Sequence, residues 1–284
     1  MKRLGIIIIG IAMAVCASAQ KVHYTRADST FVTQLLTEAR SLPQTTNLPL
    51  YFARKFIGRP YVGFTLEVCD PERLVVNTRQ LDCTTLVENV TALTLCINSK
   101  HYCWRDFLNA LSRIRYRDGR LDGYTSRLHY FTDWIVDNTV KGVVSEVQQQ
   151  SAPFTAVQTI NVSYMSSHPE SYKALKAHQQ MVHVIKKQEE KLNGRKFRYI
   201  PKNAVGNTKA MRDAVHDGDI IAITCNKAGL DIAHLGFAVW RKDGLHLLNA
   251  SQLHKKVVEE PMTLGQYLSK HPSHTGIRIV RIEK

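Results

Sequence analysis

The stretch RQLDCTTLVENVTALTLCI, residues 79–97, places one cysteine directly before a run with helical periodicity. Apolar residues at i, i+4, i+7 and i+11 predict a helix with a single apolar stripe. These positions are Leu86, Val90, Leu93 and Ile97. Cys83 stands at the N-terminal end, where helix N–H groups and the helix dipole favour a thiolate. From this stretch alone it could be a core residue, half of a disulfide or a nucleophile.

The first residues, MKRLGIIIIGIAMAVCASAQ, have a basic start, a short apolar run and small residues spaced A-x-A. This pattern predicts a secretory signal peptide over residues 1–19, and hence an exported, periplasmic protein. Val15 fits a lipoprotein cleavage site poorly, so we expect ordinary cleavage rather than a lipid anchor on Cys16. No later segment reaches the ~18 apolar residues of a transmembrane helix.

The chain is strongly basic, with a formal net charge of +14. Removing Lys2 and Arg3 with the leader leaves +12. Such a surface favours a polyanion or an anionic surface. The chain contains no basic run with interleaved aromatic residues, which is the pattern that would indicate nucleic acid as a partner. Carboxylate-rich cell-wall peptides and acidic lipid headgroups suit an exported protein, and charge that only maintains solubility is an equal alternative.

Helical patterns come first and strand patterns follow, which predicts an α+β fold. No repeat or linker divides the chain, so residues 20–284 are expected to form a single domain. Helices are predicted over residues 28–42, 48–56, 83–97, 103–116, 170–193 and 262–271. Strands are predicted over residues 155–165, 197–200, 218–224, 234–241, 244–251 and 277–283.

Five cysteines follow the leader, an odd number, so at least one is unpaired within the chain. We expect that one to be Cys83. Cys96 and Cys103 would be too far apart on one continuous helix, but a break near Asn98 could bring them together. The pairing among the other four stays open: Cys69, Cys96, Cys103 and Cys225.

A catalytic cysteine needs a histidine that is itself oriented by a polar group. His234 opens the segment HLGFAVW after a turn, which places an imidazole at the rim of a sheet. A hairpin around Asp243–Gly244 would bring Asn249 within reach of His234. The chain order Cys, His, Asn is that of a cysteine hydrolase. His216, Asp217 and Asp219 are not followed by further ligands at metal-binding spacing, so no metal or cofactor is expected.

Together, the segments GRPYVG, LDCTTLVENV, DGDIIAI, AHLGFAVW and LLNAS, spread over about residues 55–255, resemble the NlpC-type papain-like cysteine hydrolases of bacterial cell walls. Within these hydrolases, the segments SRLHYF and LDCTTLVEN most resemble a secreted branch of N-acetylmuramoyl-L-alanine amidases that act on anhydro-muropeptides. The resemblance implies a papain-like fold with the nucleophile at a helix N-terminus, packed on an antiparallel sheet or small barrel.

The resemblance also implies roles. Cys83 would attack as a thiolate, His234 would hold it ionised and protonate the leaving amine, and Asn249 would orient the imidazole. Tyr61 would stabilise the oxyanion together with the Cys83 backbone N–H. Thr84-Thr85 replaces the usual Ser-Gly and Asn249 stands where His is frequent, which leaves specificity open. The long separation of Cys83 from His234 implies a substrate-shaping insertion at about residues 100–195.

Other polar residues are candidates for substrate binding. In the segment YTSRLHY, Arg127 would pair with a substrate carboxylate. An equal alternative is that YTSRLHY is a core element whose arginine lies at the surface. Glu67 is also a candidate for substrate binding, with a position in a surface loop as the equal alternative. Glu88 lies on the catalytic helix and its role stays open. The remaining candidates for the cleft are Tyr124, Ser126, His129 and Tyr130.

The sequence therefore predicts an exported, monomeric cysteine amidase that hydrolyses the N-acetylmuramoyl-L-alanine bond of peptidoglycan-derived muropeptides through a thioester. One alternative is a γ-D-glutamyl-diamino-acid endopeptidase on the same fold. The other is a basic cell-wall-binding module without catalytic activity.

Overall fold

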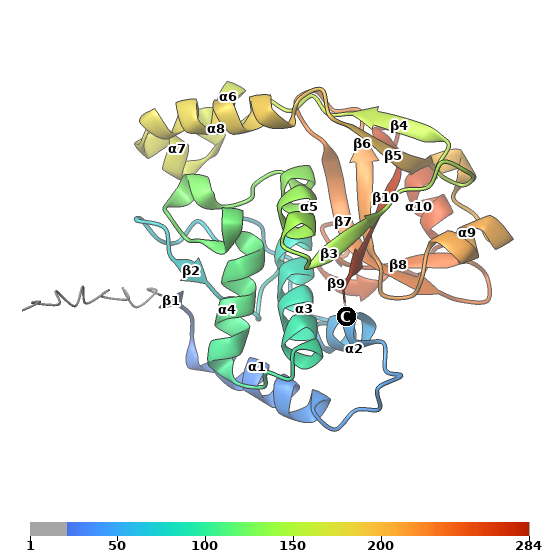
Figure 1. Ribbon diagram of the computed structural model, residues 1–284, viewed down its shortest axis with the longest axis horizontal. Helices are drawn as coiled ribbons and strands as arrows, with labels where there is room; N and C mark the ends of the chain where they lie inside the picture. The colour runs from blue at the N-terminus through green and yellow to red at the C-terminus, as the bar shows by residue number, and fades with distance from the viewer. Residues whose placement is uncertain (1–21, 284) are drawn as a thin grey trace, which may run out of the picture.

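A computed structural model describes residues 22–283. The helices predicted over residues 28–42, 48–56, 83–97, 103–116 and 262–271 are present with small shifts at their ends. The first helices are α1 Arg26–Ala39, α2 Leu48–Lys55, α3 Cys83–Asn98, α4 Trp104–Arg115 and α5 Phe131–Val140, and the sequence did not predict α5. The later helices are α6 Tyr164–Ser167, α7 Lys173–Ala177, α8 Gln180–Leu192, α9 Lys209–Ala214 and α10 Leu264–Ser269. Helices α1–α5 lie on one side of a large sheet and α9 and α10 on the other (Figure 1).

The sheet has eight strands in the order β4-β5-β10-β6-β7-β8-β9, with β3 also paired to β10. Every pair in it is antiparallel, as the predicted hairpins require. Its strands are β3 Val144–Val147, β4 Ala156–Thr159, β5 Lys196–Pro201, β6 Ile220–Cys225, β7 Ile232–Trp240, β8 Leu245–Ser251, β9 Lys256–Glu259 and β10 His274–Ile282. A separate parallel pair joins β1 Val22–His23 to β2 Leu74–Val75.

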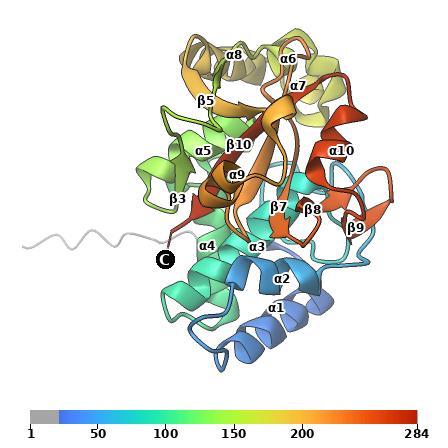
Figure 2. The same cartoon turned by 90° about the vertical axis from the view of Figure 1, so that its right-hand side faces the viewer.

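The main core lies between helices α1–α5 and the sheet. Leu86 and Val90 of α3 are fully buried in it together with Leu235 and Phe237 of β7. A second core includes Ile221 and residues of α9 and α10. The mixed α+β fold with an antiparallel sheet is thus confirmed, and α3 lies against the sheet (Figure 2). Residues 85–94 of α3 are all buried, so the helix is covered on every side and not along a single apolar stripe as predicted.

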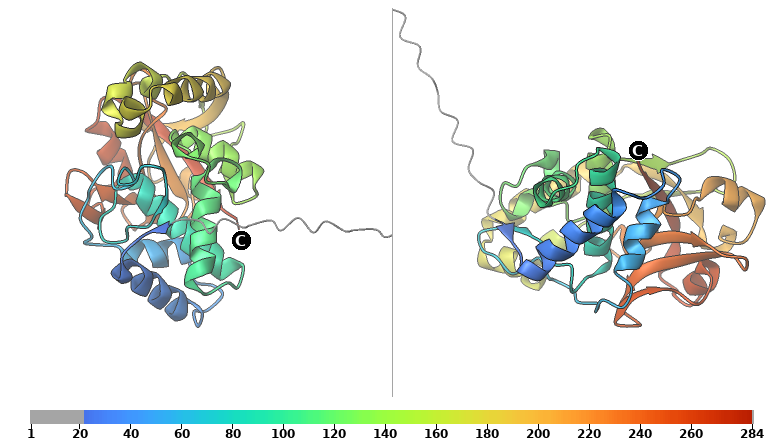
Figure 3. Two further views of the ribbon diagram at one scale, coloured as in Figure 1. Left: turned by 90° about the vertical axis from the view of Figure 1, so that its left-hand side faces the viewer. Right: turned by 90° about the horizontal axis from the view of Figure 1, so that it is seen from below.

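The residues between α3 and β6 divide into two parts. Helices α4 and α5 belong to the main core, whereas α6–α8 form a third apolar cluster with Tyr124 and Tyr130. This cluster lies at the end of the molecule opposite α1 in Figures 1 and 3. The segment at about residues 100–195 is therefore partly integral to the main core and partly a small addition to it.

The single helix predicted over residues 170–193 is wrong. The chain forms a short 3₁₀ turn, then α7, and breaks at His178 before α8 begins. His178 has non-helical backbone angles and its Nε2 lies 2.8 Å from Asp70 Oδ2. The break lets α7 fold back so that its buried Leu175 joins Ile185 of α8 in one cluster, which a continuous helix could not do.

The leader predicted over residues 1–19, with Cys16, lies outside the described residues. Within residues 22–283, no helix combines the length and the apolar character needed to cross a membrane. All five cysteines in this part of the chain are free.

Glu88, whose role the sequence left open, forms a buried ion pair. Its Oε2 lies 2.7 Å from Arg115 Nε, and both side chains are 2% exposed. Burial raises the pKa of Glu88, and the Arg115 guanidinium opposes that rise. Arg115 also donates to the Val75 carbonyl, so the pair ties α3, α4 and β2 together.

We expect Glu88→Leu to lower the free energy of unfolding by about 3–5 kcal/mol, because Arg115 would remain buried without its carboxylate. Glu88→Leu combined with Arg115→Met should recover most of that loss, since no unpaired charge remains. Urea denaturation measures both. The exposed Lys209–Asp213 pair provides a control whose disruption should have little effect. A double variant as unstable as the single one would contradict the prediction.

Candidate active site

The start of α3 is fixed by a capping box. Asp82 Oδ1 accepts the Thr85 N–H at 2.8 Å, and Thr85 Oγ1 accepts the Asp82 N–H at 2.9 Å. Just before it, the Leu81 N–H donates to the Pro60 carbonyl, and the Val62 N–H donates to the Leu81 carbonyl. These bonds leave no freedom in where the helix begins, so Cys83 is held as its first residue.

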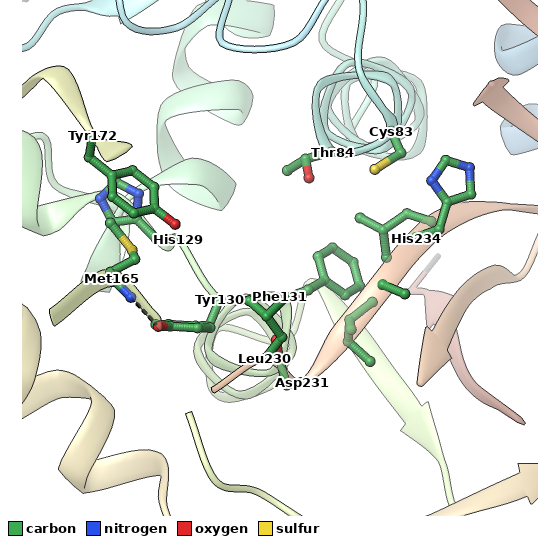
Figure 4. A pocket seen from close by; sticks show the side chains of 13 residues that line it. Cys83, Thr84, His129, Tyr130, Phe131, Met165, Tyr172, Leu230, Asp231 and His234 are labelled. Carbon is green, nitrogen blue, oxygen red and sulfur yellow. Dashed lines mark hydrogen bonds between the residues drawn. The ribbon is translucent and has the colours of Figure 1, made fainter. Parts of the chain in front are cut away.

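The Cys83 thiol lies against β7. The backbone N–H of Leu235 and both the backbone and hydroxyl of Thr84 form hydrogen bonds with it. Cys83 and His234 line a pocket of about 170 Å³ and lie on one side of it in Figure 4. The pocket is lined by Cys83, Thr84, His129, Tyr130, Phe131, Met165, Tyr172, Leu230, Asp231, Ile232, Ala233, His234 and Leu235.

The register of β7 and β8 sets the contact between His234 and Asn249. Phe237 pairs with Leu248, so Asn249 falls opposite Gly236, two residues from His234 and on the same face. His234 Nε2 lies 2.9 Å from Asn249 Oδ1, as the predicted hairpin requires. A Cβ on Gly236 would approach the Leu248 carbonyl oxygen to 2.6 Å, so only glycine allows this strand spacing.

The protonation state of Cys83 differs from the thiolate that the sequence predicted. Burial raises the pKa of the Cys83 thiol to about 12, and the neighbouring Asp82 carboxylate adds to the rise. Burial also lowers the pKa of His234, although Asn249 and Glu260 oppose that fall. Both shifts favour a neutral thiol beside a neutral imidazole before substrate arrives. The benefit expected from the helix N-terminus is outweighed by desolvation.

Tyr61 lies beside the start of α3 because a parallel bridge joins it to Leu81. Its pKa is raised to about 12, mainly by burial and then by Cys83 and Asp82. The phenol therefore stays protonated and can donate a hydrogen bond near Cys83.

Only part of the segment YTSRLHY reaches the pocket. His129 and Tyr130 line it, on the side opposite Cys83 in Figure 4. Burial and Arg127 lower the pKa of His129 well below its usual range, and its Nε2 lies 3.1 Å from the Tyr124 carbonyl. Since a carbonyl only accepts, Nε2 carries the hydrogen. Ser126 instead bonds to the backbone of its own turn.

Arg127 is not a free substrate anchor. Its side chain is 6% exposed and its guanidinium contacts Glu67 Oε1 at 2.5 Å and Glu72 Oε1 at 3.6 Å. It also stacks over the Tyr124 ring. The structure therefore brings Glu67, Tyr124 and Arg127 to one another rather than to the pocket with Cys83. A substrate carboxylate would have to displace a buried internal pair to reach Arg127.

Thr84 and Phe131, which also line the pocket, belong to the segments LDCTTLVENV and SRLHYF noted in the sequence. Met165, Tyr172 and Asp231 carried no sequence signal, because they enter the pocket from separate elements and no motif connects them. Glu260, which contacts Asn249, follows β9, a strand that the sequence did not predict. Among residues 22–283, no group of three or more His, Cys, Asp or Glu side chains could hold a metal ion.

A family model for N-acetylmuramoyl-L-alanine amidase-like proteins, named AmiA-like, matches residues 51–277. The chain belongs to this AmiA-like family. The match spans α2 to β10 and so includes the pocket and every residue discussed around it. No curated protein sequence matches the chain.

Solved structures agree with the family. An N-acetylmuramoyl-L-alanine amidase from Bacteroides uniformis is 42% identical, with a TM-score of 0.78 over 84% of this chain and 98% of that one. A Bacteroides fragilis protein with a provisional description as a xylanase is also 42% identical, with a TM-score of 0.77 over 82% and 100%. A Legionella pneumophila protein, 21% identical with a TM-score of 0.70 over 90% and 94%, shares the fold.

We expect Asp82→Asn to speed alkylation of Cys83 by iodoacetamide at about pH 8. Asn caps helices as well as Asp, so α3 is kept while a charge that raises the pKa of Cys83 is removed. The rate should climb with pH above neutrality in both forms, without the plateau that a thiolate–imidazolium pair gives. Peptide mass spectrometry assigns the label to Cys83, and free Cys69 is the internal control. An unchanged Cys83 rate would refute the electrostatic argument.

Proposed function

We propose that this protein is an exported cysteine amidase on a papain-like, NlpC-type fold. It hydrolyses the amide between N-acetylmuramic acid and L-alanine in peptidoglycan fragments, with anhydro-muropeptides as the preferred class. The observation that carries the proposal is the Cys83 thiol at a helix N-terminus, sharing a pocket with a His234 that is bonded to Asn249. The AmiA-like family and the Bacteroides uniformis amidase support the choice of bond.

Because the Cys83 thiol and the His234 imidazole are both neutral before substrate binds, the reaction begins with a proton transfer between them. Asn249 Oδ1 only accepts, so His234 donates from Nε2 and its Nδ1 is free to act as a base. Nδ1 takes the thiol proton while Cys83 Sγ attacks the lactyl carbonyl carbon. The imidazolium then protonates the alanine nitrogen, the C–N bond breaks, and the peptide leaves. Water, activated by His234, hydrolyses the lactyl thioester and restores the thiol.

The oxyanion of each tetrahedral intermediate needs donors near Cys83. We assign this role to the Tyr61 hydroxyl and the Cys83 backbone N–H. The phenol stays protonated because burial raises its pKa to about 12. A well-placed donor of this kind stabilises the transition state by about 3 kcal/mol.

Residues 20–284 form one catalytic domain in this proposal, and the segment at about residues 100–195 shapes its pocket. Tyr130, Met165 and Tyr172 come from that segment and form the wall opposite Cys83 (Figure 4). Aromatic and thioether groups pack against the apolar faces of sugar rings and short side chains. We assign this wall to the sugar and the first residues of the stem peptide.

Glycoside hydrolysis, suggested by the description of the Bacteroides fragilis protein, fits the pocket poorly. That chemistry uses two carboxyl groups flanking the bond. Asp231 is the single carboxylate that lines the described pocket, and its Oδ2 is engaged by the Thr132 N–H at 2.7 Å.

The substrate bond is tested by mass spectrometry of products from an anhydro-disaccharide tetrapeptide. Free anhydro-disaccharide with intact tetrapeptide is the expected result, because the lactyl amide is the bond assigned to Cys83. A disaccharide dipeptide would instead identify the γ-D-glutamyl endopeptidase. Binding without turnover would identify a cell-wall-binding module.

We expect Cys83→Ala to reduce turnover by at least about a thousandfold, because no other group can form the thioester. Its melting temperature should stay close to wild type, since the change removes one atom from a small side chain at a helix end. Cys69→Ala is the matched control, because Cys69 is also free and partly exposed. Turnover by Cys83→Ala near the wild-type rate would exclude Cys83 as the nucleophile.

A further inference from the structure

A buried carboxylate lies behind the proposed catalytic residues. Glu260 follows β9, and its side chain is 1% exposed. Its Oε1 accepts from Asn249 Nδ2 at 3.1 Å, and its Oε2 lies 3.1 Å from His254 Nε2. The Glu260 N–H donates to the Leu247 carbonyl at 2.8 Å, so its backbone is tied to β8 as well. A row of contacts thus runs His234, Asn249, Glu260, His254.

Two acceptors face the Asn249 Nδ2 group: Glu260 Oε1 at 3.1 Å and the Leu247 carbonyl at 3.5 Å. The contact with Glu260 is shorter and involves a charged acceptor, so it has the larger influence on which way the Asn249 amide points. An asparagine side chain has a donor end and an acceptor end, and rotation by about 180° exchanges them. A carboxylate only accepts, so it draws the Nδ2 group toward itself. The carbonyl Oδ1 is then left facing His234 Nε2.

That orientation matters because the two ring nitrogens have different duties. With Oδ1 facing it, Nε2 must carry hydrogen and Nδ1 is available as a base. A rotated amide would present its NH₂ to Nε2, which favours the opposite tautomer with hydrogen on Nδ1. That tautomer cannot take the Cys83 proton, and a wrong tautomer in a hydrolase triad costs orders of magnitude in rate.

We propose that Glu260 is a positioning residue that locks the Asn249 amide and, through it, the tautomer of His234. The inference rests on the proposed cysteine amidase function. His254 completes the arrangement, since it occupies the second carboxylate oxygen from a partly exposed position. Glu260 does not line the pocket, so it acts on substrate only through Asn249 and His234.

The decisive test exchanges the amide and the carboxylate. Asn249→Asp places two carboxylates against each other. Their repulsion moves the side chain at position 249 away from His234, which loses the acceptor that holds Nε2, and kcat should fall by about ten- to a hundredfold. When Asn249→Asp is combined with Glu260→Gln, the amide introduced at position 260 donates to the carboxylate introduced at position 249, whose other oxygen accepts from His234. We expect this double variant to regain at least about tenfold in kcat with KM unchanged. A double variant no faster than Asn249→Asp overturns the proposal. These changes preserve side-chain size.

A double-mutant cycle tests the coupling between Glu260 and Asn249 independently of the exchange of amide and carboxylate. Glu260→Ala should lower kcat by about ten- to a hundredfold in the wild type and leave it unchanged in an Asn249→Ala background. A loss of equal size in both backgrounds would show a merely structural role and overturn the proposal. Glu259→Gln is the matched control, since the neighbouring carboxylate pairs with Arg54 and Arg241 instead. It should leave kcat unchanged.

A second readout separates this inference from the choice of substrate. Alkylation of Cys83 by iodoacetamide needs no muropeptide and depends on His234 acting as a base. It should slow in Asn249→Asp and recover in the double variant. If wild type does not cleave the muropeptide yet alkylation follows this order, the proposed function fails and the positioning role stands. If wild type cleaves it and neither kcat nor alkylation follows this order, only the positioning role fails.

Discussion

The packing of the first turn of α3 on β7 is the contact on which the remaining structure depends. The capping box of Asp82 and Thr85 fixes where the helix begins, and Leu86 and Val90 pack in the main core that also contains Leu235 of β7. With both settled, the Cys83 thiol meets the Leu235 N–H. A helix that started one residue later would turn the thiol by about 100° away from the strand.

Polar groups behind this contact are buried, and burial of each is unfavourable unless it is hydrogen-bonded. Asn249, Glu260 and the Glu88–Arg115 pair are all satisfied by partners from different elements. Such networks stabilise less than an apolar core of equal volume, but they admit few alternative geometries. These buried side chains therefore hold the surroundings of the pocket rigid, and the positions of hydrogen-bond donors and acceptors there decide the chemistry. The same burial keeps the thiol neutral until substrate is bound.

The pieces that could be predicted from sequence are those with local causes. The helix at Cys83 and the hairpin that carries His234 and Asn249 follow from periodicity and a two-residue turn, and both are present. Arg127 shows where local reasoning stops. A polar segment next to a predicted cleft does not reveal that Glu67 and Glu72, about 60 residues earlier in the chain, already neutralise its guanidinium. The continuous helix over residues 170–193 failed for a similar reason, because α7 gains more by folding back on α8 than by extending it.

By itself, the sequence determined that helices come first and antiparallel strands follow, that Cys83 stands at a helix start, and that His234 and Asn249 lie in one hairpin. Capping, periodicity and strand register act over a few residues, so the local sequence contains their causes. Only the tertiary structure decided that the thiol is desolvated, that Arg127 is paired, and that Glu260 stands behind Asn249. Burial and long-range hydrogen bonds join residues far apart in the chain, and no local pattern records which of them will meet.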